Sequence, residues 1–174
     1  MPAANLTPVS VLDDALAQAR AAARAVLSLV AETLHHQFPT GAYLVLIRPS
    51  SDDREDAVTL DSVRDAHGQV LQEIDLYGMD PGRFPSVPKD IAALWGSTDP
   101  QDPGAVLDLI QRIDGVSPYE FLDFLPSELR TAEEIRAEND GGRTPLGLPL
   151  RSADCPQHGA LCEPDDHIEP PTGV

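Results

Sequence analysis

The sequence is poor in lysine, cysteine and aromatic residues. Lys89 is the only lysine, and the 12 basic residues are outnumbered by 29 acidic ones, which gives a formal net charge of −17 at pH 7. A surface of this sign repels nucleic-acid phosphates and anionic lipid head groups, so we expect neither direct nucleic-acid binding nor membrane binding. The charge favours a basic protein partner, including one whose nucleic-acid site the chain would occupy by mimicry.

Other absences narrow the class of protein further. Two cysteines, Cys155 and Cys162, are too few for a disulfide framework. No apolar run approaches the ~20 residues that a membrane-spanning helix requires. Asp13 and Asp14 also lie where a signal or transit peptide carries no acidic residue. We therefore expect a cytoplasmic protein.

What remains is a composition compatible with a globular domain. The chain has 174 residues, of which 41% are hydrophobic and 24% charged, enough for one domain with a buried core. We predict an α+β fold for residues 1–138, in which a long N-terminal helix packs on a three-stranded antiparallel β-meander and several short helices follow. Residues 139–174 include six Pro and five Gly and show no hydrophobic period, which predicts a flexible, disordered acidic tail.

The N-terminal helix is predicted from its capping residues and its apolar stripe. Thr7-Pro8 and Ser10 each suit a helix start, because Thr and Ser cap free backbone N–H groups and Pro is tolerated at the first helical position. A helix of about 27 residues follows, with apolar side chains at three- and four-residue spacing. We expect this stripe to cover one face of the meander: Leu12, Leu16, Ala19, Ala23, Leu27, Val30 and Leu34.

The meander is predicted between residues 42 and 76. Residues 42–47 are apolar on both faces, which is typical of a central strand covered on both sides. Residues 57–64 and 69–76 are half polar, as in strands with one solvated face. We therefore expect the first strand to be buried and the other two to expose one face.

The loop between the second and third predicted strands fixes their register. Asp65 and Gly68 occupy the first and fourth positions of a type I turn. A three-residue loop with Gly68 in the left-handed conformation pairs Asp65 with Gln69, and so sets Leu60 opposite Ile74 on the buried face. A two-residue loop would bury a carboxylate opposite Leu60, at a cost of several kcal/mol, so we favour the three-residue loop.

The same register gathers carboxylates on the opposite face. Asp61 is predicted to lie directly across from Glu73, with Asp75 beside them, and Asp52 and Asp53 in the preceding loop continue the charge. One interpretation is a solvated sheet face, and the other is a surface that binds a cationic protein partner. The carboxylates do not follow the order of a helix-loop-helix calcium site, so no dedicated metal loop is predicted.

Short helices are predicted after the meander. One begins near Pro88, a second runs from Asp102-Pro103 to Gly115, and Ser117 opens a capping box for a third. A further helix follows Pro126. The third of these helices would carry an aromatic cluster, Tyr119, Phe121 and Phe124. This cluster is interpreted either as an anchor for a partner or as a lid that closes the core on the sheet.

The tail holds one constellation with ligand chemistry. Cys155, His158, Cys162 and His167 follow a Cys-x2-His-x3-Cys-x4-His order, and two thiolates with two imidazoles can close a tetrahedral zinc shell. The spacing resembles that of a zinc knuckle, but it departs from the Cys-x2-Cys-x4-His-x4-Cys pattern of that family in order and in its middle gap. The alternative is two unrelated histidines with two free thiols, or with a Cys155–Cys162 disulfide that closes an eight-residue loop on oxidation, and no cofactor.

Three functions from different classes follow. The first is an acidic, non-enzymatic protein-interaction module, that is, an adaptor, regulator or inhibitor of a basic or apolar partner. The second is a zinc-containing accessory protein that uses the tail cluster. The third is an enzyme of unassigned class, for which Asp61 and Glu73 are the nearest to an acid/base pair. The sequence carries no Gly-x-Ser-x-Gly, His-Glu-x-x-His or Gly-rich phosphate motif.

Overall fold

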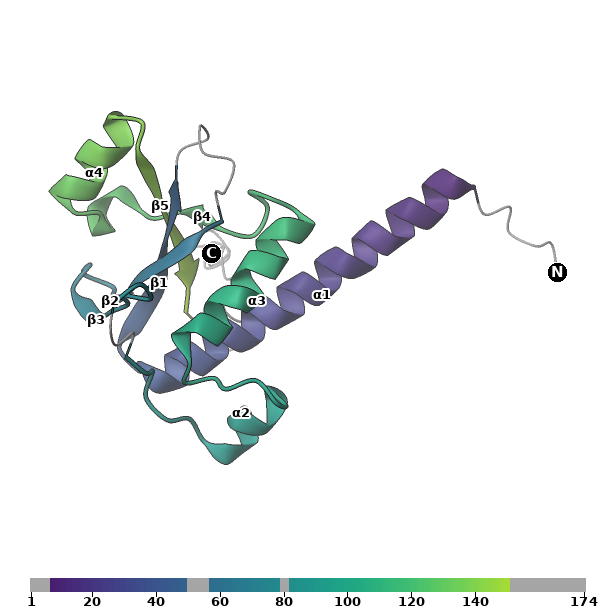
Figure 1. The fold of residues 1–174 in the computed structure, drawn as a ribbon, viewed down its shortest axis with the longest axis horizontal. Helices are drawn as coiled ribbons and strands as arrows, with labels where there is room; N and C mark the ends of the chain where they lie inside the picture. The colour runs from purple at the N-terminus through teal and green to yellow at the C-terminus, as the bar shows by residue number, and fades with distance from the viewer. Residues whose placement is uncertain (1–6, 50–56, 79–81, 151–174) are drawn as a thin grey trace, which may run out of the picture.

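The computed structural model describes residues 7–49, 57–78 and 82–150 and shows an α+β fold (Figure 1). Helices pack on a five-stranded antiparallel sheet with the strand order β3-β2-β1-β5-β4. In the described part of the chain, no helix has the length and apolar composition needed to cross a membrane. The elements in chain order are α1 (Pro8–Gln37), β1 (Gly41–Pro49), β2 (Thr59–Asp65), β3 (Val70–Glu73), α2 (Lys89–Leu94), α3 (Pro103–Val116), β4 (Asp123–Phe124), the 3-10 helix η1 (Ser127–Leu129), α4 (Ala132–Asn139) and β5 (Arg143–Pro149).

The long N-terminal helix forms as predicted but covers the sheet with only part of its length. Thr7 caps it, because its hydroxyl oxygen accepts a hydrogen bond from the Ser10 backbone N–H at 3.2 Å. The predicted apolar stripe is buried only from Ala23 onward, whereas Leu12 and Leu16 are 59% and 39% exposed. The N-terminal half of α1 projects away from the rest of the molecule (Figure 1).

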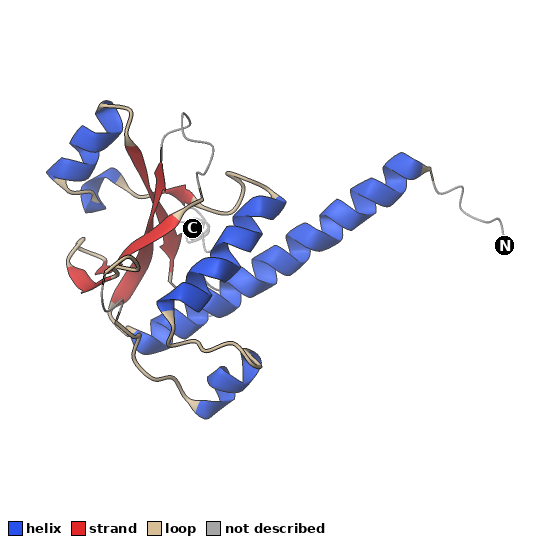
Figure 2. Ribbon diagram, in the orientation of Figure 1, coloured by secondary structure: helices blue, strands red, loops and turns tan. Residues whose placement is uncertain are grey.

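β1 is the central strand, as predicted, and both of its faces are covered (Figure 2). On one face, Leu44 and Leu46 pack in the main core with residues of α1 and α3. On the other face, Val45 packs with Leu125 and Leu129 from the segment before α4. The sheet therefore lies between two layers, as predicted for the first strand, whereas the sequence predicted one solvated face for the second and third strands.

The body of the molecule extends beyond the predicted boundary at residue 138. Residues 143–149, assigned to the flexible tail, instead form β5 between β1 and β4. Leu146 and Leu148 of β5 and the following Leu150 are at most 6% exposed, a period of two that the intervening Pro and Gly residues obscured. Close packing favours glycine at position 147, because an added Cβ would lie 3.0 Å from Cδ1 of Tyr43.

The loop between β2 and β3 forms as predicted. The Gly68 N–H donates to the Asp65 carbonyl oxygen at 3.1 Å, and the Asp65 N–H donates to the Gln69 carbonyl oxygen at 3.0 Å. Gly68 has a φ of 80°, which is the left-handed conformation expected of it. Leu60 and Ile74 both lie in the main core, each 6% exposed.

A bulge in β3 overturns the predicted β2–β3 register beyond this loop, and a bulge in β2 interrupts its pairing with β1. In β2, Val45 of β1 pairs with Ser62 but the next residue, Leu46, pairs with Leu60, so Asp61 is an extra residue. In β3, a second shift makes Leu71 the extra residue. Each extra residue moves the following side chains to the opposite face.

The chain between α3 and α4 also differs from the prediction. α3 starts at its Asp102 cap as expected but continues through Gly115 to Val116, so Gly115 is not a left-handed cap. Residues 117–120 form a turn that leads into the short strand β4, instead of a third helix. The capping box was the wrong signal here, because the Tyr119 backbone adopts a φ of 67°, which is incompatible with a right-handed helix.

The left-handed turn residue gives a first prediction. Gly68→Ala will lower the free energy of unfolding by about 1–2 kcal/mol, because φ is positive there and the new Cβ would lie 3.3 Å from the Leu129 carbonyl oxygen. The matched control is Gly115→Ala in α3, which has open space around it and will raise stability by up to about 1 kcal/mol. Urea unfolding measures both, and equal effects of the two substitutions would contradict the assigned turn.

Candidate functional site

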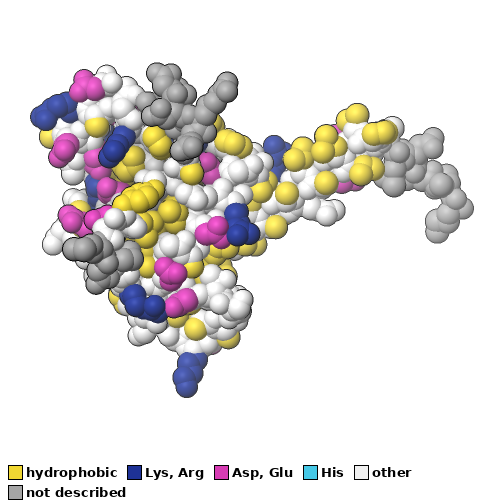
Figure 3. Space-filling model, in the orientation of Figure 1, with side chains coloured by type: hydrophobic (Ala, Val, Ile, Leu, Met, Phe, Trp, Pro, Cys, Tyr) yellow, Lys and Arg dark blue, Asp and Glu magenta, His cyan; other side chains and the backbone are white. Residues whose placement is uncertain are grey.

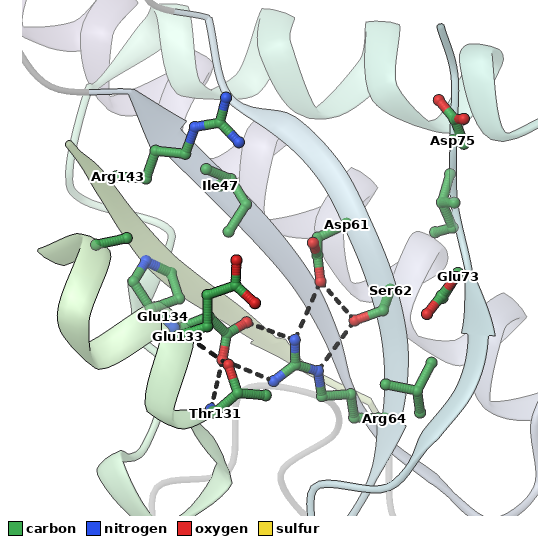
Figure 4. A pocket seen from close by; sticks show the side chains of 14 residues that line it. Ile47, Asp61, Ser62, Arg64, Glu73, Asp75, Thr131, Glu133, Glu134 and Arg143 are labelled. Atoms are coloured by element: carbon green, nitrogen blue, oxygen red, sulfur yellow. Dashed lines mark hydrogen bonds and ion pairs between the residues drawn. The ribbon is translucent and has the colours of Figure 1, made fainter. Parts of the chain in front are cut away.

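A groove of about 480 Å³ lies between the β2–β3 hairpin and α4 (Figure 4). It opens on the sheet face that carries Val45, because Ser62 in its lining pairs with Val45. Apolar side chains, among them Ile47, Val70 and Pro145, form part of its wall. Seven charged residues also line this acidic groove: Asp61, Glu73, Asp75, Glu133 and Glu134, with Arg64 and Arg143.

The structure brings three of the predicted partner-binding carboxylates together, although not in the predicted register. Asp61, Glu73 and Asp75 all line the acidic groove. Glu73 pairs with Ser62 rather than with Asp61, because the extra residue in β3 shifts the register by one position. The Ile74 N–H donates instead to the Asp61 carbonyl oxygen at 2.8 Å. Asp52 and Asp53 lie outside the described residues.

Arg64 is the central residue of this site, and the sequence analysis did not identify it. It is 3% exposed, and its guanidinium group lies at the base of the groove among oxygen acceptors (Figure 4). Nη2 donates to Asp61 at 3.1 Å, Nε donates to the Ser62 hydroxyl at 3.0 Å, and Nη1 donates to the Leu129 carbonyl oxygen at 3.0 Å. Both terminal nitrogens also bind the carboxylate of Glu134.

Glu134 links this buried cation to the start of α4. Its carboxylate accepts a hydrogen bond from the Thr131 backbone N–H at 2.7 Å, while its own N–H donates to the Thr131 hydroxyl, which completes a capping box. Burial would raise the pKa of Glu134, but the hydrogen bonds and charge of Arg64 and the bond from Thr131 outweigh it, so the pKa lies below its usual value. The pKa of Arg64 shifts in the opposite direction: burial would lower it, but the hydrogen bonds and charges of Glu134 and Asp61 outweigh burial and raise it above its usual value.

The bulge at Asp61 explains why Arg64 reaches these acids. Simple alternation from Leu60 would place Arg64 on the core face and Val63 on the polar face. The extra residue places each of the two side chains on the other face of the sheet. Val63 is therefore fully buried in the main core, and Arg64 points toward Glu134. The three-residue spacing between Leu60 and Val63 is the sequence signal that could have revealed the bulge.

The rim of the acidic groove keeps three exposed carboxylates. Glu73, Asp75 and Glu133 are exposed, and within the described residues none of them forms an ion pair with Lys, Arg or His. Carboxylates above an apolar wall suit a basic side chain, whose aliphatic stem can pack below while its charged end meets the rim.

A second pocket, of about 410 Å³, holds two of the three predicted aromatic residues. Tyr119 and Phe124 line it and are 74% and 66% exposed. The Arg48 guanidinium carbon lies 4.1 Å from the centroid of the Tyr119 ring, a cation–π contact, and Nη2 donates to Asp114 at 2.7 Å. Arg143 lines both this aromatic pocket and the acidic groove, so the two sites adjoin.

Phe121 does not belong to this surface. It is 8% exposed and packs in the main core, with the Arg24 guanidinium 5.8 Å from its ring centroid. Because residues 117–120 form a turn and not a helix, Phe121 points inward while Tyr119 and Phe124 remain outside. For Phe121, the structure fits the lid interpretation and contradicts a role as an exposed anchor.

The predicted zinc ligands Cys155, His158, Cys162 and His167 lie outside the described residues. Within the described ranges, no group of three or more His, Cys, Asp or Glu residues is arranged to hold a metal ion. Asp61 is hydrogen-bonded to Ser62 and Arg64, so it is not positioned as the acid/base partner of Glu73 that the enzyme hypothesis requires.

The Arg64–Glu134 pair gives a prediction on stability. Glu134→Gln retains the capping box, since Gln also serves at that position, but leaves a buried guanidinium undercompensated, so we expect a loss of about 3 kcal/mol. Asp108→Asn is the matched control: the Arg112–Asp108 pair is exposed, and its loss will change stability by no more than about 0.5 kcal/mol. Chemical unfolding of these two variants tests the buried pair, and a cycle of Arg64→Leu, Glu134→Leu and the double variant measures the coupling. Additive effects of the two Leu substitutions would contradict a coupled pair.

The same pair predicts a pH dependence. Because the pKa of Glu134 is lower in the folded protein, the ion pair contributes fully above the unfolded value of about 4.3. Its contribution is lost as the pH falls from there through the folded pKa. The stability difference between the native protein and Glu134→Gln will therefore be constant near neutral pH and shrink below that window, as measured by unfolding at a series of pH values. A difference that persists unchanged in strong acid would refute the charge-based origin.

The chain matches no protein-family model, and neither a curated protein nor a solved structure shows significant similarity to it.

Proposed function

We propose that the protein is a non-enzymatic interaction module, a cytoplasmic adaptor, regulator or inhibitor, that binds a basic segment of a protein partner in the acidic groove. The observation that carries this proposal is the set of exposed, unpaired carboxylates on the groove rim, Glu73, Asp75 and Glu133. They come from two parts of the chain, β3 with the segment that follows it and α4, so the folded structure assembles the site.

The charge balance of the groove supports a cationic ligand. Five carboxylates and two guanidinium groups line it, a net charge of −3. Arg64 does not compete with a ligand for the rim, because its donors are taken up by Asp61, Ser62, Glu134 and the Leu129 carbonyl oxygen. The rim carboxylates are therefore available to lysine or arginine side chains.

The adjoining aromatic pocket supports a second point of contact for the same partner. Tyr119 keeps an exposed ring although its backbone is in the left-handed region, a conformation that costs about 1–2 kcal/mol for a residue with a Cβ. Strain of this kind is concentrated at functional sites. The exposed rings of Tyr119 and Phe124 together offer an apolar contact. A partner segment with both basic and apolar residues therefore fits the combined surface.

An array of synthetic peptides tests the proposal. Each peptide carries Lys or Arg next to apolar residues, and a companion peptide has Gln in place of each basic residue. The native protein is expected to bind basic members at physiological ionic strength and to lose them as salt rises, because exposed charges are screened. Neutralising the rim with Glu73→Gln, Asp75→Asn and Glu133→Gln will weaken binding roughly tenfold, at about 0.5 kcal/mol for each charge.

A control variant separates the groove from net charge. Asp14→Asn, Asp90→Asn and Asp108→Asn remove the same number of exposed carboxylates from α1, α2 and α3. This variant is expected to bind the array as the native protein does. Equal weakening in both variants would show that only overall charge matters, and an array without basic-peptide binding would reject the proposed function.

A further inference from the structure

The N-terminal half of α1 is an unpartnered helix. Between Pro8 and Ala22, every residue is exposed except the partly buried Ser10 and Ala19, and this α1 arm projects from the body with hydrophobic side chains on its surface (Figure 3). Val9, Val11, Leu12 and Leu16 are 67%, 51%, 59% and 39% exposed. Scattered exposed aliphatic residues are common, but four within eight residues form a patch.

The apolar stripe of the arm continues the face that packs on the body. At 100° per residue, Val9, Leu12, Leu16 and Ala19 fall within about 80° of one another and in line with the buried Ala23, Leu27, Val30 and Leu34. The body covers this stripe from Ala23 onward and leaves the rest bare. The sequence therefore maintains one packing face along the whole helix, although its own chain fills only part of it.

We infer that the arms of two copies of this chain pair antiparallel to form a twofold dimer. Side-chain volume favours this partner, because the stripe on the arm carries Val9, Leu12 and Leu16 toward its N-terminus and the small Ala19 at its other end. Antiparallel pairing centred near Leu16 sets Leu12 of one copy against Ala19 of the other, whereas parallel pairing sets Leu12 against Leu12. A surface that complements itself in this way meets the requirement of a twofold interface.

Charge favours the same arrangement. Asp13 and Arg20 lie on the same flank of the apolar stripe, so twofold antiparallel pairing brings Asp13 of one copy toward Arg20 of the other. Twofold parallel pairing would place these two residues on opposite sides of the interface. Arg20 and Arg24 contact Glu120 of the body but remain 45% and 55% exposed. The net charge of −17 opposes association of two bodies side by side, and an antiparallel pair of arms keeps them at opposite ends.

Analytical ultracentrifugation of the full chain tests whether the dimer exists. The native protein is expected to show a concentration-dependent dimer, since the contact is confined to one stripe on each helix. Leu12→Gln/Leu16→Gln will shift it to monomer without loss of helix content, because both residues are exposed and Gln is a good helix former. Tyr77→Gln/Leu94→Gln, which removes exposed apolar residues elsewhere, will leave the dimer intact. A native protein that stays monomeric, or a dimer that survives the arm substitutions, overturns the inference.

Spin labels test the direction of pairing. Single cysteines at Ser10, Asp14, Gln18 and Ala22, in a chain with Cys155→Ser and Cys162→Ser, place labels outside the stripe. In an antiparallel pair the distance between identical labels is shortest at one of the two inner positions. Moving the label by one residue toward either end lengthens the component of this distance along the helix axis by about 3 Å, because each of the two labels moves by the rise per residue of about 1.5 Å. Distances that are the same at all four positions would show parallel pairing, and no measurable distance would show that the arms do not meet.

Discussion

The site depends on one buried cation. Arg64 is held at the base of the acidic groove by Glu134, Asp61 and the Leu129 carbonyl oxygen, and these contacts attach α4 to the sheet. α4 has no fully buried residue of its own, so hydrophobic packing contributes little to its position. Within the described residues, α4 forms one further ion pair, between Glu138 and Arg130. The outer wall of the groove is therefore positioned by charge, which explains why a chain so rich in carboxylates uses a buried arginine here.

The bulges decide which acids of the groove are held in ion pairs and which are not. With unbroken alternation, Asp61 would face Glu73 across the strands, and two like charges would oppose each other in water. The extra residues in β2 and β3 instead commit Asp61 to Arg64 and leave Glu73 on the rim. The same irregularity thus separates a structural carboxylate from a carboxylate that is free to bind. It also adds Val63 to the core without moving Leu60 out of it.

The parts of the fold that sequence reasoning identified are those determined by local chemistry. The α1 cap at Thr7, the α3 cap at Asp102, the Gly68 loop and the buried β1 strand each depend on a few adjacent residues. The parts that it missed depend on distant contacts. β5 needs β1 and β4 on its two sides to satisfy a strand interrupted by Pro and Gly, and Arg64 needs Glu134, 70 residues away, to be stable when buried.

Charge is distributed unevenly over the molecule, and this has a consequence for binding. The acidic groove lies on the body, while the α1 arm is mostly apolar and carries both signs of charge. If the arms pair antiparallel, each dimer presents two grooves on opposite ends, with the arms as a spacer of fixed length. A partner with two basic segments that can span that length would then bind the dimer more tightly than either groove alone, because the second contact becomes intramolecular. Binding of such a partner would also reduce the electrostatic repulsion between the two acidic bodies, because its positive charge neutralises part of their negative charge.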